Sequence, residues 1–153
     1  MDFVVNEWLP EYFRSDATVE EKRKLEVFLN KFMLRKDVLY VRRPSEFLGK
    51  IYRYAKLHQH DNKVSTELKK FIKTILYDSE RCFFVDDGEF NLADEITAKL
   101  TEGGNTISDK YLFEAATMTS TKTIVTTDLP LKSLMIDNVT FKIELLDDFL
   151  TRY

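Results

Sequence analysis

The stretch ISDKYLFEAATMTSTKTIVTTD, residues 107–128, decides the fold prediction because a helix pattern leads directly into a strand pattern. Ser108 is expected to cap the helix at its first turn. The apolar stripe of this helix comprises Leu112, Ala115, Ala116 and Met118. Residues 122–126 then predict a strand, because β-branched side chains fit a pleated surface. A helix followed by a strand is typical of α/β domains.

Each half of this stretch carries one acid at a position that suits a functional site. Asp109 falls in the first turn of the predicted helix, where the helix dipole favours an anion. Asp128 directly follows the predicted strand, and ligands of α/β sheets bind beyond the carboxyl ends of the strands. Taken singly, each acid has a simple structural explanation, as a helix-cap charge or a turn former. The occurrence of both acids in one stretch favours a functional site.

The rest of the chain continues the alternation of strands and helices. Strands are predicted at residues 2–6, 38–41, 81–85 and 139–143. Helices are predicted at residues 7–13, 18–35, 44–55, 63–77 and 92–100, with a loop or short helical turn at 129–136 and a closing turn at 146–150. This order predicts one α/β domain over residues 1–153, with a central, mainly parallel sheet flanked by helices.

Composition narrows the class of protein. The chain is 44% apolar and 13% aromatic, which is typical of a globular domain. Its single cysteine, Cys82, lies in an apolar run and is expected to be buried and reduced, as in the cytosol, so a cytoplasmic location is predicted. We expect no membrane span and no signal peptide, because no apolar run of about 18 residues occurs.

Charge is distributed unevenly along the chain. Residues 1–73 contain 16 Lys and Arg against 11 Asp and Glu, whereas residues 74–153 contain 7 against 15. This asymmetry predicts an anionic partner for the first half and a metal ion or a basic protein for the second. Ordinary solvated helix faces are the alternative explanation.

Two further polar residues occupy positions like those of Asp109 and Asp128. Asn6 ends the first predicted strand, and Glu46 opens the helix after the second. Carboxylate and amide oxygens gathered at one sheet edge are ligands for Mg²⁺ or Mn²⁺, which can activate water against a phosphodiester. The neighbouring basic residues Arg42, Arg43, Lys50 and Arg53 are candidates to bind RNA phosphates, or else form a salt-bridged helix face.

Four segments together resemble a known family. They are FVVNEWL, SEFLGKIYRYA, the stretch 107–128 and FKIELLDDFL, and they cover nearly the whole chain. Their order and spacing resemble the PIN-domain ribonucleases, and within that family the VapC-like toxins of toxin–antitoxin pairs. The resemblance implies a three-layer fold, RNA hydrolysis with Mg²⁺ or Mn²⁺, an antitoxin partner and a homodimer. Carried over by position, the metal-binding and catalytic residues are Asn6, Glu46, Asp109 and Asp128, with Thr126 or Thr127 orienting the site.

Asn6 departs from the family pattern, in which the first strand ends in an aspartate. An amide offers the metal one negative charge fewer, so we predict weak metal binding and little activity. Either an Asp was exchanged for Asn to silence a toxic enzyme, which the three intact acids favour, or the chain is a naturally degenerate nuclease. We expect no substitute ligand, since Glu7 should point away from the site and Asp2 lies at the other end of the strand.

Other functions remain open from the sequence. A degenerate PIN fold can serve as a non-catalytic RNA-binding or protein-binding module, and the same acids occur in phosphatases and flap-type nucleases. The early helices carry large aromatic residues that either pack in the core or form a groove for an antitoxin helix or a dimer partner. These residues are Trp8, Tyr12, Phe28 and Phe32.

Overall fold

The computed structural model describes residues 1–153 and is built around a five-stranded sheet in which all neighbouring strands are parallel. The strands are β1 (Asp2–Val5), β2 (Val38–Arg42), β3 (Cys82–Val85), β4 (Thr123–Thr126) and β5 (Lys142–Leu145). Their spatial order is β3-β2-β1-β4-β5, with Phe3 opposite Leu39 and Val4 opposite Ile124. The predicted α/β class with a parallel central sheet is confirmed.

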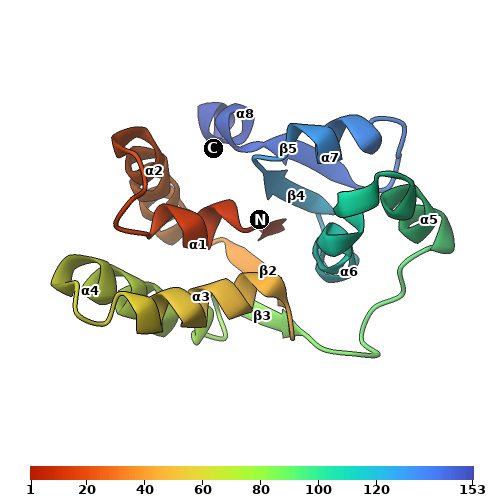
Figure 1. Ribbon diagram of the computed structural model, residues 1–153. Coiled ribbons are helices and arrows are strands. Elements are labelled where there is room, and N and C mark those ends of the chain that lie inside the picture. Colours follow the sequence, from red (N-terminus) through yellow and green to blue (C-terminus); the bar gives the residue numbers. More distant parts are fainter.

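Helices cover both faces of this sheet and complete three layers (Figure 1). The helices of one face are α1 (Trp8–Tyr12), α2 (Val19–Arg35), α3 (Glu46–Leu57), α4 (Asn62–Phe71) and α8 (Leu146–Arg152), with the π-helical turn η1 (Ile72–Leu76) continuing α4. Those of the other face are α5 (Asp94–Glu102), α6 (Lys110–Ala116) and α7 (Leu129–Leu134), with the 3-10 helix η2 (Gly104–Asp109) leading into α6. This arrangement is consistent with a three-layer PIN-like fold.

Alternation along the strands supplies both halves of the core. Phe3 and Val5 of β1 face the larger helical layer, whereas Val4 between them faces α5, α6 and α7. On the larger side, Phe28 is fully buried, stacking on Phe32 and meeting Trp8 edge-on. Trp8, Phe28 and Phe32 are therefore core residues and cannot form a surface groove.

Local signals in the sequence explain where two long helices begin. Thr18 and Glu21 form a capping box at the start of α2, in which the Glu21 amide donates to the Thr18 hydroxyl at 3.1 Å. Ser45 caps α3 by accepting from the Leu48 amide at 3.2 Å. This cap places Glu46 in the first turn of α3, as predicted.

The start and end of the helix predicted in residues 107–128 are different in the structure. Ser108 is not its cap: it lies within η2 and donates to the Asn105 carbonyl at 2.8 Å. Because η2 runs directly into α6, Asp109 becomes the residue just before the helix and no side chain caps it. Met118 lies beyond the end of α6 and is 37% exposed, while Phe113 takes the buried position.

The last strand begins later than predicted. The expected range was 139–143, but Val139 is fully exposed and β5 spans Lys142–Leu145. Glu144 is buried inside this strand because Arg152 and Lys142 pair with its carboxylate. An acid that is buried with ion-pair partners does not follow the apolar pattern used to predict strands.

Two other predictions can be compared with the structure. Cys82 is buried, and burial raises the pKa of its thiol to about 12. None of the helices combines the length and the apolar character needed to cross a membrane.

Candidate functional site at the carboxyl edge of the sheet

The strand order places a topological switch point between β1 and β4. The chain builds β1, β2 and β3 outward in one direction and then returns to place β4 and β5 on the other side of β1. The helices that follow β1 and β4, which are α1 and α7, therefore pack on opposite faces of the sheet. Ligands of open α/β sheets bind at this topological switch point.

Asn6 and Thr126 meet across this switch point. Asn6 is 6% exposed, and its Nδ2 donates to the Thr126 hydroxyl at 2.6 Å. Its Oδ1 accepts from the Trp8 amide at 3.3 Å, at the start of α1. The Thr126 hydroxyl also accepts from the Asp128 amide at 3.0 Å, so one hydroxyl joins both strand ends. Thr127, by contrast, is exposed and makes no side-chain hydrogen bond, which distinguishes the two threonines named as orienting candidates.

Asp128 has a structural role as well as a place at the site. One carboxylate oxygen accepts from the Leu131 amide at 2.9 Å and caps α7. This bond fixes the carboxylate at the switch point and leaves its second oxygen without a hydrogen-bond partner. The simple explanation for Asp128, a turn and cap residue, is thus correct and does not conflict with metal binding.

Asp109 is the most perturbed acid of the site. It is 8% exposed, and burial, followed by the charges of Glu7 and Asp128, raises its pKa from 3.8 to about 7. Because both neighbours are negative, the site disfavours a further anion and favours a cation. The structure therefore places Asp109 within reach of the charge of Asp128.

Glu7 and Tyr111 also belong to this site, and the sequence prediction missed them. Glu7 was expected to point away, but its charge acts on Asp109 more strongly than that of Asp128 does. The expectation was wrong because β1 ends at Val5 and Glu7 has helical backbone angles, so strand alternation no longer applies. The Tyr111 hydroxyl is buried without a hydrogen-bond partner, and burial and Glu7 raise its pKa.

Glu46 lies at the periphery of this set of acids. Its side chain is 52% exposed and forms an ion pair with Arg53 at 3.4 Å. It still contributes to the raised pKa of Tyr111, after burial and the charges of Glu7 and Asp109, so it lies on the same side of the sheet as the other acids. Asp2, as expected, is at the opposite end of β1, where it accepts from Ser120. We call Glu7, Glu46, Asp109 and Asp128, together with Asn6, the acidic edge.

The four predicted phosphate-binding residues all have acidic partners. Arg42 is buried and pairs with Asp87, and Arg43 pairs with Asp86 at 2.7 Å. Lys50 pairs with Glu11 at 2.7 Å and Arg53 with Glu46 at 3.4 Å. Local carboxylates thus already neutralise these cations, which is the alternative that the sequence left open.

The acidic edge has the donor atoms that a hard divalent cation prefers, but not the close grouping of a complete metal site. All its donors are oxygen atoms, as Mg²⁺ and Mn²⁺ require, and the desolvated Asp109 lies among uncompensated negative charges. No three Asp, Glu, His or Cys side chains, however, are close enough to form a ready-made metal site. Mg²⁺ commonly binds through one or two carboxylates and completes its shell with waters and substrate phosphates. Asp109 and Asp128 suit that mode of binding.

Comparisons with protein-family models, with curated proteins and with solved structures found no match to this chain.

Proposed function

We propose that the chain is a metal-dependent endoribonuclease of the PIN type, acting at the acidic edge. The observation that carries the proposal is the burial of Asp109 beside Glu7 and Asp128, which raises the pKa of Asp109 to about 7. Negative charge concentrated at the switch point of a parallel sheet is the arrangement that a cation-dependent hydrolase needs.

In this proposal each residue has a defined part. Asp109 and the free oxygen of Asp128 would hold Mg²⁺ or Mn²⁺, and Glu7 would supply the negative charge that Asn6 lacks. The ion would lower the pKa of a coordinated water and neutralise charge on the phosphate. Asn6 and Thr126 keep the two strand ends together through their hydrogen bond, while Glu46 borders the site from α3.

Cleavage of a labelled single-stranded RNA in Mn²⁺ tests the proposal. Asp109→Asn and Asp128→Asn should each lower the cleavage rate by about 100-fold, since each removes a ligand charge. Asp137→Asn is the matched control, because Asp137 is exposed after α7 and has no ion-pair partner; it should cleave normally. Cleavage that persists in EDTA, or that is equal in all variants, would overturn the proposal.

The second candidate is a non-catalytic RNA-binding or protein-binding module on the same fold. It is favoured by the neutral Asn6 and by the lack of three converging acids. This candidate predicts that the chain binds RNA or protein but cleaves no RNA with any divalent metal ion. The Asn6→Asp variant should not cleave RNA either. The toxin role within the main proposal adds an antitoxin and a homodimer as partners, in the cytoplasm; stoichiometric co-purification with a small DNA-binding protein tests it.

A further inference from the structure

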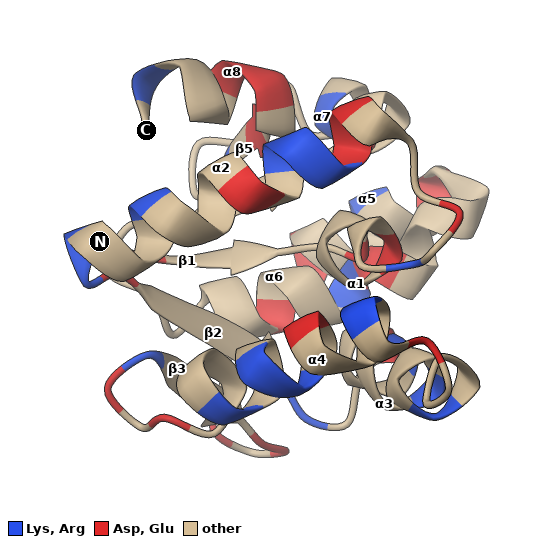
Figure 2. Cartoon of the chain, turned by 90° about the vertical axis from the view of Figure 1, so that its left-hand side faces the viewer, with Lys and Arg blue, Asp and Glu red and all other residues tan.

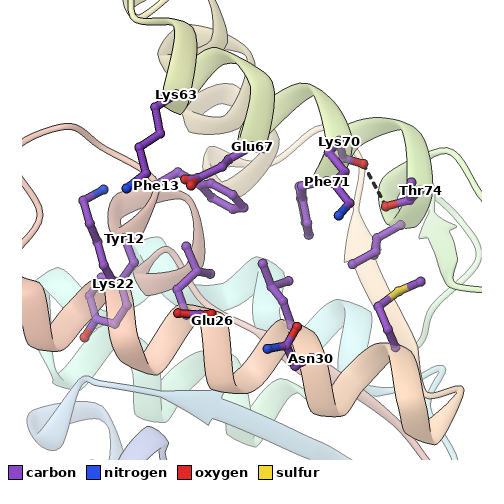
Figure 3. A pocket seen from close by; sticks show the side chains of 14 residues that line it. Tyr12, Phe13, Lys22, Glu26, Asn30, Lys63, Glu67, Lys70, Phe71 and Thr74 are labelled. Atoms are coloured by element: carbon purple, nitrogen blue, oxygen red, sulfur yellow. Dashed lines mark hydrogen bonds between the residues drawn. The ribbon is translucent and has the colours of Figure 1, made fainter.

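A cleft of about 440 Å³ lies between α2 and α4, and no residue of the acidic edge lines it (Figure 3). Tyr12 and Phe13, at the end of α1, form part of its lining, and Phe13 packs on Phe71 of α4 with ring centroids 5.4 Å apart. Leu25, Leu29, Met33 and Ile75 add apolar walls. A volume of this size is within the range of pockets that bind small ligands or parts of larger ones.

Each of the two helices lines the cleft with a stripe at helical spacing. On α2 the stripe is Lys22, Glu26, Leu29 and Met33; on α4 and η1 it is Lys63, Glu67, Lys70 and Thr74. Residues three and four apart share one face of a helix, so the stripes border the cleft from opposite sides, as Figure 3 shows. The cleft is therefore a lined space between two helices.

The charged side chains of these stripes are left without ion-pair partners. Lys63, Lys70, Glu26 and Glu67 form no salt bridge, and Lys22 donates only to the Arg14 carbonyl, at 2.8 Å. This contrasts with Arg42, Arg43, Lys50 and Arg53, all of which are paired. Segments of Lys or Arg recur along α3 and α4 in the charge view (Figure 2). The cleft thus offers three lysines and two carboxylates, none of them in an ion pair, beside apolar walls.

The lysines, apolar walls and carboxylates of the cleft together suit a nucleotide as its occupant. Lysines suit phosphates, and apolar walls suit the face of a base. The Glu26 and Glu67 carboxylates and the Asn30 amide suit the hydrogen-bonding edge of a base, whose exocyclic amino groups need acceptors. A simple anion would leave the apolar walls unused, and an apolar peptide helix would bury the unpaired charges at a cost.

We propose that the α2–α4 cleft binds one nucleotide of single-stranded RNA, with Lys63 and Lys70 on its phosphates and its base between α2 and α4. The inference rests on the proposed function in that the same RNA strand would be cut at the acidic edge. Helix α1 connects the two places, beginning next to Glu7 and ending at Tyr12, and its five residues span about 7.5 Å. The cleft and the acidic edge are therefore joined by one short helix.

Fluorescence anisotropy with a labelled 12-nucleotide single-stranded RNA in EDTA tests this inference without any cleavage. Lys63→Ala/Lys70→Ala is compared with Lys69→Ala/Lys73→Ala, which removes the same charge from the same helical segment but outside the cleft. We expect the first pair to weaken binding about tenfold and to reduce the slope of log K against log salt by about 1.4, and the second to change little.

A third variant, Asn30→Phe, fills the cleft from an exposed position of α2 without removing a cation. It should also weaken binding about tenfold, because the base is excluded. Equal loss in both lysine pairs, undiminished binding in Asn30→Phe, or no RNA binding by the unmodified chain would each overturn the inference. RNA binding is measured in EDTA and does not depend on cleavage, so failure of catalysis and failure of the cleft give different results.

Discussion

Asn6 Nδ2 and the Thr126 hydroxyl lie 2.6 Å apart and join the ends of β1 and β4 at the switch point of the sheet. Thr126 accepts both this bond and one from the Asp128 amide, so its own proton remains free for another acceptor. An aspartate at position 6 could instead accept that proton. The neutral amide is thus accommodated by the hydrogen-bond network as well as by the charge of the site.

Asn6→Asp should strengthen metal binding at the acidic edge. The added carboxylate brings one more negative charge to Asp109, Glu7 and Asp128, and charge count tunes cation affinity. We expect Mn²⁺ to bind about tenfold more tightly by calorimetry, and RNA cleavage to rise with it. A large gain in Mn²⁺ affinity and cleavage agrees with the explanation that an aspartate at position 6 was exchanged for asparagine. Unchanged Mn²⁺ affinity and unchanged cleavage contradict that explanation and favour natural divergence.

Glu7→Gln should lower the pKa of Asp109. Burial is the largest cause of the raised value, about 7, and it remains in this variant, but the leading charge effect is removed. We expect a downward shift of about one unit, followed by carbon NMR of the Asp109 carboxyl group. Glu11→Gln is the matched control one helical turn away, since Glu11 pairs with Lys50. Equal shifts in both variants would show that Glu7 is not close to Asp109.

Stability should fall as pH rises from about 4 to 7, because of Asp109. Its pKa is raised in the folded chain, so between these values the folded state holds a proton that the unfolded state releases. Asp109→Asn removes this dependence and should raise the free energy of unfolding at pH 7.5 by about 1 kcal/mol, after allowance for solvent screening. Urea unfolding at pH 4.5 and 7.5 measures both effects. A pH profile identical to that of the unmodified chain would contradict the prediction.

Phe28→Ala should destabilise the fold strongly. Phe28 is fully buried and packs against the rings of Trp8, Phe32 and Tyr153, so its removal leaves a cavity. We expect a loss of about 4 kcal/mol in the free energy of unfolding, measured by urea titration. Val19→Ala, at an 88% exposed position of the same helix, should cost little. A small loss for Phe28→Ala would mean that this ring is a surface contact after all.

The sequence by itself determined the α/β class, the first four strands and the place of Asp128 after the fourth, because these follow from local periodicity and from turn chemistry. Only the tertiary structure decided which groups share an electrostatic environment. Glu7 joins the acidic edge because α1 begins immediately after β1, and Glu144 can be buried because Arg152 comes back to pair with it. Burial and charge coupling depend on distances between residues far apart in the chain, and no local pattern records those distances.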